Sequence, residues 1–390
     1  MISIRPRFFP KPIPAGCEMS MTKHYEVLDG LRGTAAVAVV VFHLCEYIFP
    51  DSASNPLRHA YLAVDFFFLL SGFVIAHAYD RRWPAMSIAG FFRIRLTRLH
   101  PLVLLGLLLG LIDYVFDPFA GNSQNAGFWL IAVNAVLGAL LLPAPDLPNR
   151  FDATHSLNSP SWSLLQEYAV NIAYALFVRR LGVRALAGLV VLSAVVLGLS
   201  AVGHGKLLDG WSWETFWLAP VRVCYPFFAG MLLYRIGGIV RMRGGYPILS
   251  AVLLAIFMLP NSSYTGLMDA AIVILAFPLV VAAGAGSAVT GRLAVLCRFF
   301  GTISYPIYIL HYPFVDIYAH WLWQGNHDSV TLWLVSTALV LGLVVFAWAA
   351  ERYVDRPVRA WLARTGRKEV AGDPPAPLPP ADLPALPALQ

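Results

Sequence analysis

The chain has 390 residues, of which 58% are hydrophobic and 13% are charged, whereas about a quarter of the residues of a soluble domain are charged. A soluble fold of this length would need more polar surface, so the composition excludes it. The net charge of +6 comes from short basic clusters between apolar blocks, which indicates membrane topology and argues against nucleic-acid binding.

Apolar blocks of the length that crosses a bilayer follow one another along the chain. We predict an all-α integral membrane protein with about ten transmembrane helices. The predicted spans are 31–49, 62–79, 101–116, 161–178, 185–203, 218–234, 246–259, 268–283, 302–320 and 331–350.

A further apolar block, 127–142, is predicted to be re-entrant or peripheral. If it crossed the bilayer, the later arginine clusters would lie on the opposite side from the arginines at 93, 95 and 98. Because Lys and Arg gather in cytoplasmic loops, we predict that every cluster and both termini lie in the cytoplasm.

Two tails flank the predicted transmembrane domain, which covers residues 25–360. Residues 1–24 contain prolines and basic residues but no apolar core, so they are expected to be a cytoplasmic extension and not a signal peptide. Residues 361–390 are rich in Pro and Ala and are predicted to form a disordered cytoplasmic tail. The four cysteines are scattered without metal-ligand spacing, so no metal site is expected.

The first predicted span holds two ionisable residues, Arg32 and His43. They are eleven residues apart, so on a helix they share one face about 16 Å apart along the axis. Arg32 is expected at the cytoplasmic rim and His43 in the outer half, where an imidazole can act as a general base. The alternative is an arginine that extends to the membrane surface and a histidine that serves only packing.

The second span opens with Asp65, and Ser71 lies about two turns deeper. A carboxylate inside a membrane needs a partner, and His43 is expected at a similar depth. The pair could orient the imidazole and stabilise its charged form, as in a catalytic triad. A purely structural Asp–His or Asp–Arg contact is the alternative.

Arg93, Arg95 and Arg98 precede the third span. Most of this cluster follows from the excess of basic residues in cytoplasmic loops. However, Arg95 and Arg98 are three apart and share a helix face, and the planar guanidinium suits phosphate oxygens. The pair is therefore a candidate phosphate site.

The fourth span begins after Ser159-Pro160, a good first-turn pair. A polar stripe then follows one helix face, at Ser163, Glu167, Asn171 and Tyr174. Such a stripe can serve helix packing alone. Glu167 is nevertheless an acid in the apolar zone, expected in its outer half, and is a candidate functional residue.

The ninth span places Ser304, Tyr308 and His311 on one face. Tyrosines can simply anchor a helix at the membrane boundary. His311 is expected near the middle of the membrane, where that explanation does not apply.

Taken in order, several segments of the chain resemble the acyltransferase 3 family of bacterial membrane proteins. They read LDGLRGTAAVAVVVFH, VDFFFLLSGFVIA, RIRLTRLHP, SPSWSLLQE and ISYPIYILHYP. The resemblance extends from about residue 25 to 360, almost the whole chain outside its tails.

The resemblance implies a multi-pass enzyme of the bacterial inner membrane that moves an acyl group, usually acetyl, from cytoplasmic acyl-CoA to a hydroxyl of a cell-envelope glycan or related acceptor. The family's Arg-x10-His pattern falls on Arg32 and His43, and its Arg-x-x-Arg pattern falls on Arg95 and Arg98. Its Trp-Ser-Leu-x-x-Glu pattern runs from Trp162 to Glu167. Acyl-CoA would be a substrate, and no permanently bound cofactor is expected.

Residues and resemblance together predict the site. The expected catalytic residues are His43 as general base, Asp65 and Glu167. The expected substrate-binding residues are Arg32, Arg93, Arg95, Arg98, Ser71, Trp162, Tyr308 and His311. Direct transfer and a covalent acyl intermediate both remain open.

Two other functions use the same residues. A glycolipid transporter or flippase would need buried polar groups along its pathway, although the chain has no convincing internal repeat. A different class of membrane acyltransferase would pair a histidine with a distant Asn or Asp, but the order of the motifs argues against it. Turnover of a thioester distinguishes the enzyme from the transporter.

Overall fold

The structure is a computed structural model that describes residues 24–369, apart from 50, 52–53, 122–124 and 243. Within these residues the chain is all helical, with loops, one isolated bridge between Ala153 and Ser212, and no strand. Residues 1–23 and 370–390, most of the two predicted tails, lie outside the described part.

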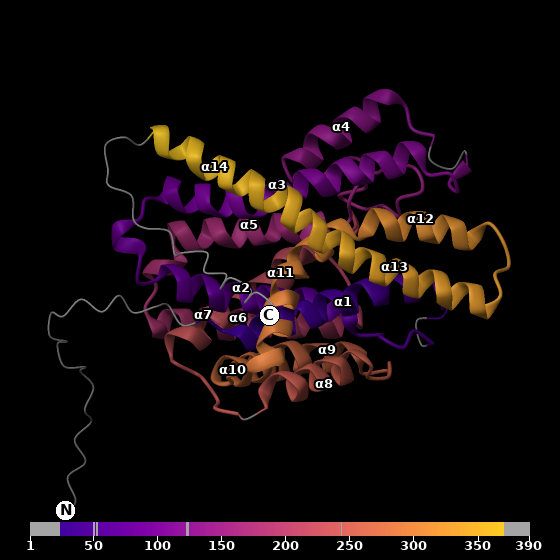
Figure 1. Cartoon of the computed structure of the whole chain (residues 1–390). Helices are drawn as coiled ribbons and strands as arrows, with labels where there is room; N and C mark the ends of the chain where they lie inside the picture. The colour runs from indigo at the N-terminus through magenta and orange to yellow at the C-terminus, as the bar shows by residue number, and fades with distance from the viewer. Residues whose placement is uncertain (1–23, 50, 52–53, 122–124, 243, 370–390) are drawn as a thin grey trace, which may run out of the picture.

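The helices run in roughly the same direction and pack side by side (Figure 1). Their bounds are α1 (Glu26–Ile48), α2 (Ala63–Tyr79), α3 (Ile88–Phe116), α4 (Phe128–Ala139), α5 (Ser161–Leu176), α6 (Val183–His204), α7 (Ala219–Arg235), α8 (Gly245–Phe257), α9 (Thr265–Ala271), α10 (Phe277–Gly286), α11 (Gly291–Leu310), α12 (Tyr312–Trp323), α13 (Ser329–Ala350) and α14 (Arg356–Glu369). Two π-helical segments, Ile272–Ala276 and Glu351–Asp355, join α9 to α10 and α13 to α14.

Eight helical stretches in the described residues are long and apolar enough to cross a membrane. They are Glu26–Ile48, Ala60–Tyr79, Ile88–Phe116, Val183–His204, Phe216–Arg235, Thr265–Gly286, Gly291–Leu310 and Ser329–Arg364. The other predicted crossings include α5 and α8, which have 16 and 13 residues, fewer than the roughly 17–25 that span a bilayer. The multi-pass membrane fold is confirmed, and the count of ten is not.

The predicted re-entrant or peripheral block corresponds to α4, which has 12 residues. At 1.5 Å per residue, it is too short to cross a hydrocarbon core of about 30 Å. The chain turns back after it, and the Asn134 side chain donates to the Pro145 carbonyl 2.9 Å away. α4 therefore lies against α3 as a short appended helix (Figure 1).

The predicted bounds are wrong in two places that matter for the site. α3 begins at Ile88, capped by the Ser87 hydroxyl, so its arginines lie inside the helix and do not precede it. The predicted ninth span is two helices, α11 and α12, which meet at His311.

Proline explains the break between α11 and α12. Pro313 has no N–H to donate to the Ile309 carbonyl, and its ring crowds that carbonyl. The Asn158 side chain donates to the Ile309 oxygen instead, at 2.9 Å. The expected domain boundary at 360 falls inside α14, which continues the α13 helix and contacts α3 (Figure 1).

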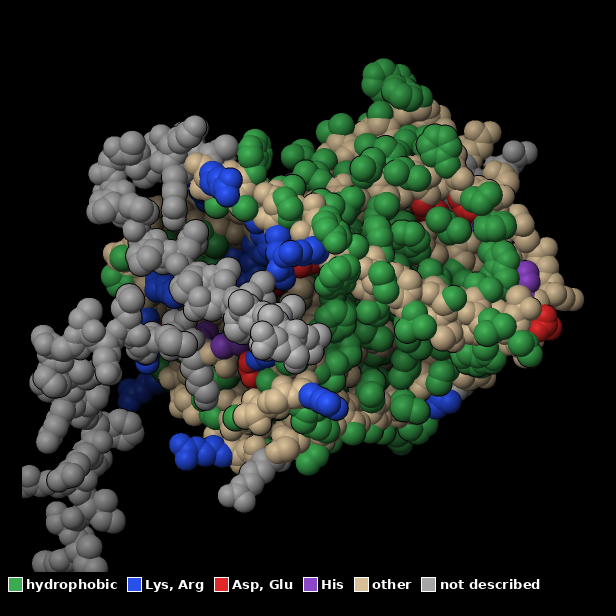
Figure 2. All heavy atoms as spheres, in the orientation of Figure 1, with side chains coloured by type: hydrophobic (Ala, Val, Ile, Leu, Met, Phe, Trp, Pro, Cys, Tyr) green, Lys and Arg blue, Asp and Glu red, His purple; other side chains and the backbone are tan. Residues whose placement is uncertain are grey.

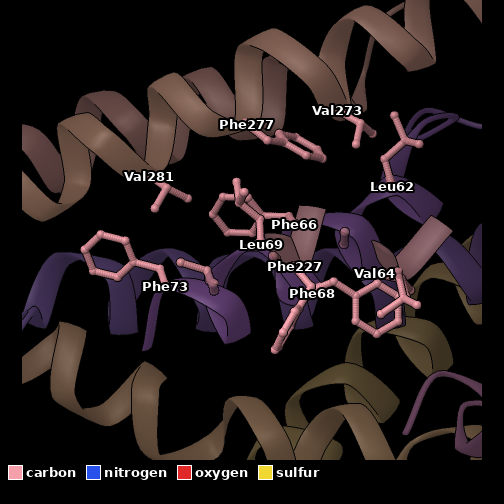
Figure 3. Packing of buried hydrophobic residues seen from close by; sticks show 14 of the residues in the cluster. Leu62, Val64, Phe66, Phe68, Leu69, Phe73, Phe227, Val273, Phe277 and Val281 are labelled. Atoms are coloured by element: carbon pink, nitrogen blue, oxygen red, sulfur yellow. The ribbon is translucent and has the colours of Figure 1, made fainter. Parts of the chain in front are cut away.

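The surface has the polarity of a membrane protein. Hydrophobic side chains cover much of the face seen in Figure 2, while many Lys and Arg side chains gather toward the end from which α14 extends. Inside, phenylalanines of α2, α7 and α10 pack together, among them Phe66, Phe73, Phe227 and Phe277 (Figure 3).

Glycine allows the closest helix contacts. A Cβ on Gly33 of α1 would lie 2.3 Å from the Phe300 Cβ, and one on Gly301 of α11 would lie 2.6 Å from the Asp29 Cβ. Small residues let membrane helices approach backbone to backbone. α1 and α11 therefore pack tightly against each other at this level.

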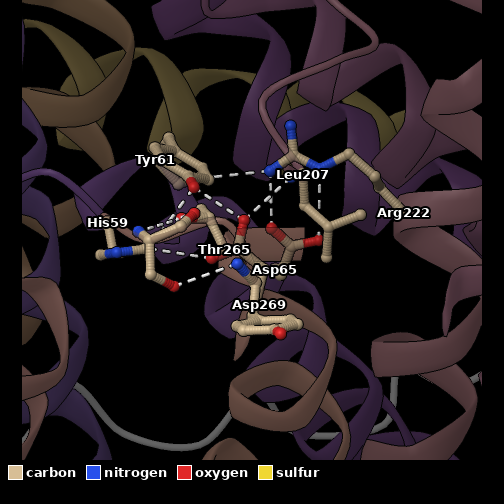
Figure 4. A network of polar contacts seen from close by, with 9 residues as sticks. His59, Tyr61, Asp65, Leu207, Arg222, Thr265 and Asp269 are labelled. Carbon is tan, nitrogen blue, oxygen red and sulfur yellow. Dashed lines mark hydrogen bonds and ion pairs between the residues drawn. The ribbon is translucent and has the colours of Figure 1, made fainter. Parts of the chain in front are cut away.

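A buried polar network ties α2, α7 and α9 together (Figure 4). Arg222 Nη2 lies 2.6 Å from Asp65 Oδ2. Asp269 accepts from His59 Nδ1 at 2.8 Å and from the Tyr61 hydroxyl at 2.7 Å. All of these side chains are buried, so each charge depends on its partner.

We predict that Asp65→Ala destabilises the protein by about 3–5 kcal/mol, because it leaves the Arg222 charge buried without its carboxylate. The control is Glu26→Ala, whose carboxylate pairs with the half-exposed Arg298 and whose loss should cost about 1 kcal/mol or less. Unfolding of the purified variants in detergent measures both. Equal stability of the two variants would contradict this assignment.

Candidate active site

Two cavities lie among the helices and share part of their lining. The larger has a volume of about 530 Å³ and is named here the arginine cavity, because Arg32, Arg95 and Arg98 line it. The smaller, of about 240 Å³, is named the histidine cavity after His43. Val64 and Tyr308 line both cavities, so the two spaces are separated there by these two side chains.

Arg32 lies at the contact of α1 with α11. Its Nε donates to the Ser304 hydroxyl at 2.8 Å, and its Nη2 donates to the Gly301 carbonyl at 3.0 Å. Asp29 Oδ1, one turn earlier on α1, lies 3.0 Å from the same Nη2. The guanidinium is therefore fixed in place, and its charge is already balanced.

Arg95 and Arg98 point into the same cavity but have different surroundings. Arg95 is buried and its Nη2 lies 2.6 Å from Glu167 Oε1. Arg98 is exposed to the cavity and makes no hydrogen bond or ion pair with the part of the chain that the structure describes. Carboxylates of Asp29 and Asp355 line the same cavity, but neither forms an ion pair with Arg98, whose N–H groups can therefore donate to an anionic ligand. Arg93, also a predicted binding residue, is exposed and lines neither cavity.

The structure places Glu167 in the arginine cavity, beside Arg95. Its Oε1 accepts from the Ser71 hydroxyl at 2.6 Å and from the Asn171 side chain at 3.4 Å, in addition to Arg95. The predicted stripe does share one inward face of α5, because Ser163 bonds to Tyr308, Tyr174 bonds to Asp80, and Asn171 is fully buried. That face meets α2 and α3 at the level of Arg95, so the expected depth of Glu167 is wrong.

Asp65 is also not a partner of His43. It lines neither cavity, and its carboxylate is paired with Arg222 of α7. The expected contact between Asp65 and His43 is therefore wrong, and the Asp–Arg alternative is correct. Trp162 lines the histidine cavity, where the Arg222 guanidinium lies 5.3 Å from its ring centroid.

The carboxylate beside His43 is Glu46, three residues further along α1. His43 Nδ1 lies 2.7 Å from Glu46 Oε2. Since a carboxylate accepts, Nδ1 carries the proton and donates it, which leaves Nε2 with a lone pair. We had not predicted Glu46, although a His–Glu pair three apart on a helix is a recognisable signal.

His311 packs face to face with His43. The ring centroids are 5.4 Å apart, with 25° between the planes. His311 Nδ1 lies 2.8 Å from the Tyr308 carbonyl and 3.1 Å from the Ile307 carbonyl, so it donates to them. Its buried Nε2 has no hydrogen-bond partner among the described residues. The two histidines were predicted separately, and the break after Leu310 brings them together.

A hydrogen bond to Ser163 of α5 holds the Tyr308 hydroxyl in place. The Tyr308 hydroxyl lies 2.7 Å from the Ser163 hydroxyl, which itself donates to the Pro160 carbonyl at 2.9 Å. Ser163 has one hydrogen to give, so Tyr308 must donate to Ser163. This bond fixes the ring at the boundary between the two cavities.

Comparisons with known proteins identify the family of this chain. Residues 25–352 match the sequence description of an acyltransferase domain. The acyltransferase MdmB of Streptomyces mycarofaciens is 29% identical, with 89% of this chain and 95% of that protein covered. The protein 2 of the picA locus of Rhizobium radiobacter is 36% identical, over 47% of this chain and 97% of that protein.

A peptidoglycan O-acetyltransferase, OatA of Listeria monocytogenes, is 23% identical over 86% of this chain and 56% of its own length. No solved structure matches the chain significantly.

Proposed function

This chain belongs to the acyltransferase 3 family, and on that premise we propose that it moves an acyl group from cytoplasmic acyl-CoA to a hydroxyl of a cell-envelope glycan or a related acceptor. It is a multi-pass membrane acyltransferase, and this family membership argues against the alternative of a glycolipid transporter without acyl-transfer chemistry. One observation supports the finer proposal best: a cavity with an unpaired arginine and a cavity with a histidine meet at a common wall.

The arginine cavity is the proposed donor site. Phosphate groups of CoA would meet Arg98 first, because Arg32 and Arg95 are each ion-paired with a carboxylate while Arg98 forms no ion pair with the described residues. Arg95 and Arg32 would add their remaining N–H groups. The apolar side chains deeper in the cavity, such as Phe67 and Leu164, would surround the pantetheine arm on its way to the wall.

The histidine cavity is the proposed acceptor site. His43 Nε2 takes the proton of an acceptor hydroxyl, and the oxygen attacks the thioester carbonyl carbon. The carbon–sulfur bond breaks, the ester forms, and His43 returns the proton to the leaving CoA sulfur. Glu46 holds the ring and offsets the charge that His43 gains.

The acceptor is proposed from the relatives and from this cavity. OatA is named for O-acetylation of peptidoglycan, and aromatic side chains that suit a sugar ring line the histidine cavity, among them Tyr61, Trp162 and Trp211. The transferred group is proposed to be acetyl. We further propose that the enzyme sits in the bacterial inner membrane, with the arginine cavity and both termini at the cytoplasmic side, as the arginine clusters indicate.

Arg98→Ala is expected to weaken CoA binding by about tenfold or more, since a hydrogen bond to a charged group contributes about 1.5–3 kcal/mol. Arg98→Lys should restore part of the loss because it keeps the charge and not the planar fork. Arg180→Ala is the control, an exposed arginine that lines neither cavity. Isothermal titration with CoA decides the matter, and wild-type affinity in Arg98→Ala would refute the donor site.

His43→Ala is expected to lower acyl transfer by about a hundredfold or more, because general-base catalysis contributes about 10²–10⁴-fold. Glu46→Gln should lower it less, since the amide still holds the ring but carries no charge. The measurement is transfer of labelled acetyl groups from acetyl-CoA into the glycan fraction, for variants that still bind CoA. If His43→Ala transfers normally, the base is another group, and His311 is the first to test.

The orientation is tested by single-cysteine labelling in a variant without the native cysteines. A cysteine at position 180 should react only when the reagent reaches the cytoplasm, and one at position 325 should react from outside the cell. Labelling of position 180 from the outside would reverse the proposed topology and move the donor site to the wrong side for cytoplasmic acyl-CoA.

A further inference from the structure

We propose that Val64 and Tyr308 form the passage through which the acyl group leaves the donor side, and that the size of Val64 limits which acyl groups the enzyme transfers. This inference rests on the proposed function, because it assumes a donor in the arginine cavity and an acceptor in the histidine cavity. It adds a pair of specificity-determining residues to that mechanism.

The two residues are the shared lining of the two cavities. Val64 lies in the first turn of α2, and Tyr308 lies near the end of α11. Both are buried, with exposed fractions of 8% and 7%. Whatever the point of reaction, the acyl group starts attached to CoA on one side and ends attached to the acceptor on the other, so it must pass between them.

The Tyr308 side of the passage is rigid. Its hydroxyl donates to Ser163, as described above. Its ring stands edge to face against Phe67, with centroids 5.4 Å apart and 79° between the planes. The His311 ring centroid lies 6.2 Å from that of Tyr308. Tyr308 therefore cannot swing aside without losing the Ser163 hydrogen bond and both ring contacts.

The Val64 side is equally restricted, for a different reason. A β-branched side chain on a helix has one strongly preferred rotamer, so Val64 offers little freedom to make room. The next turn of α2 is also packed, because Phe68 is buried and lines the arginine cavity. A passage between a fixed ring and a fixed isopropyl group admits a small acyl group and excludes a bulky one.

Changing the volume of Val64 should therefore shift acyl preference in a predictable direction. Val64→Ala removes two methyl groups and should favour a branched acyl group relative to acetyl. Val64→Ile adds a methylene and should disfavour the branched acyl group relative to acetyl. A single methylene in a selective pocket changes discrimination by about 10–200-fold, so we expect the isobutyryl-to-acetyl ratio to rise at least tenfold in Val64→Ala.

The test uses membrane vesicles from the source cells, in which the gene is replaced by each variant. The vesicles receive labelled acetyl-CoA, propionyl-CoA and isobutyryl-CoA, and the label transferred to the glycan fraction is counted for each. Val74→Ala and Val39→Ala are matched controls, because Val74 lines only the arginine cavity and Val39 only the histidine cavity. Both controls should keep the wild-type ratio.

The outcomes separate this inference from the proposed function. If wild-type vesicles transfer no label from any acyl-CoA, the proposed donor is wrong. If the wild type transfers acetyl and the Val64 variants bind CoA but keep its ratio, the passage lies elsewhere while the function stands. An equal shift in Val74→Ala or Val39→Ala would also refute the claim that the Val64–Tyr308 wall sets acyl size. If Val64→Ala fails to bind CoA, the Val64→Ile variant tests the inference instead, since its isobutyryl-to-acetyl ratio should fall below that of the wild type.

Discussion

The close packing of α1 against α11 is the contact on which the rest of the site depends. Glycine at 33 and 301 lets the two helices approach closely, because small residues allow membrane helices to pack backbone to backbone. The contact puts Arg32 against Ser304 at one level and His43 against His311 some three turns further along. A bulkier residue at either glycine would separate the helices and disturb both ends of the site together.

Ion pairing determines which buried groups can take part in the chemistry. Asp65 is paired with Arg222 and Glu167 is paired with Arg95, so neither carboxylate is available to His43. The low dielectric of the membrane makes such pairings compulsory. Two groups that line the cavities can still bind a ligand: the Arg98 guanidinium, which forms no ion pair with the described residues, and Nε2 of His43, whose Nδ1 is the atom bonded to Glu46. The proposed function assigns substrate binding to the first and proton transfer to the second.

Much of this arrangement follows from the sequence, and the rest does not for physical reasons. Helix periodicity predicts that Arg32 and His43 share a face and that Ser163 and Glu167 share another. Periodicity along one helix does not determine which faces of different helices meet, so the expected partner of Asp65 and the expected depth of Glu167 are both wrong. The break at His311 depends on Pro313 and on Asn158 from a distant loop. Glu46 is not among the predicted residues because it lies near the C-terminal end of α1, where a carboxylate needs no special explanation.

The proposed mechanism requires that the donor and the acceptor bind in the two cavities, on opposite sides of Val64 and Tyr308. The most direct test is an experimental structure with a thioether analogue of acetyl-CoA, which binds like the donor and cannot transfer its acyl group. The account predicts the phosphates beside Arg98 and the acetyl group at Val64 and Tyr308, within reach of a hydroxyl held by His43. An analogue bound in the histidine cavity, or with its acetyl group turned away from Val64 and Tyr308, would contradict it.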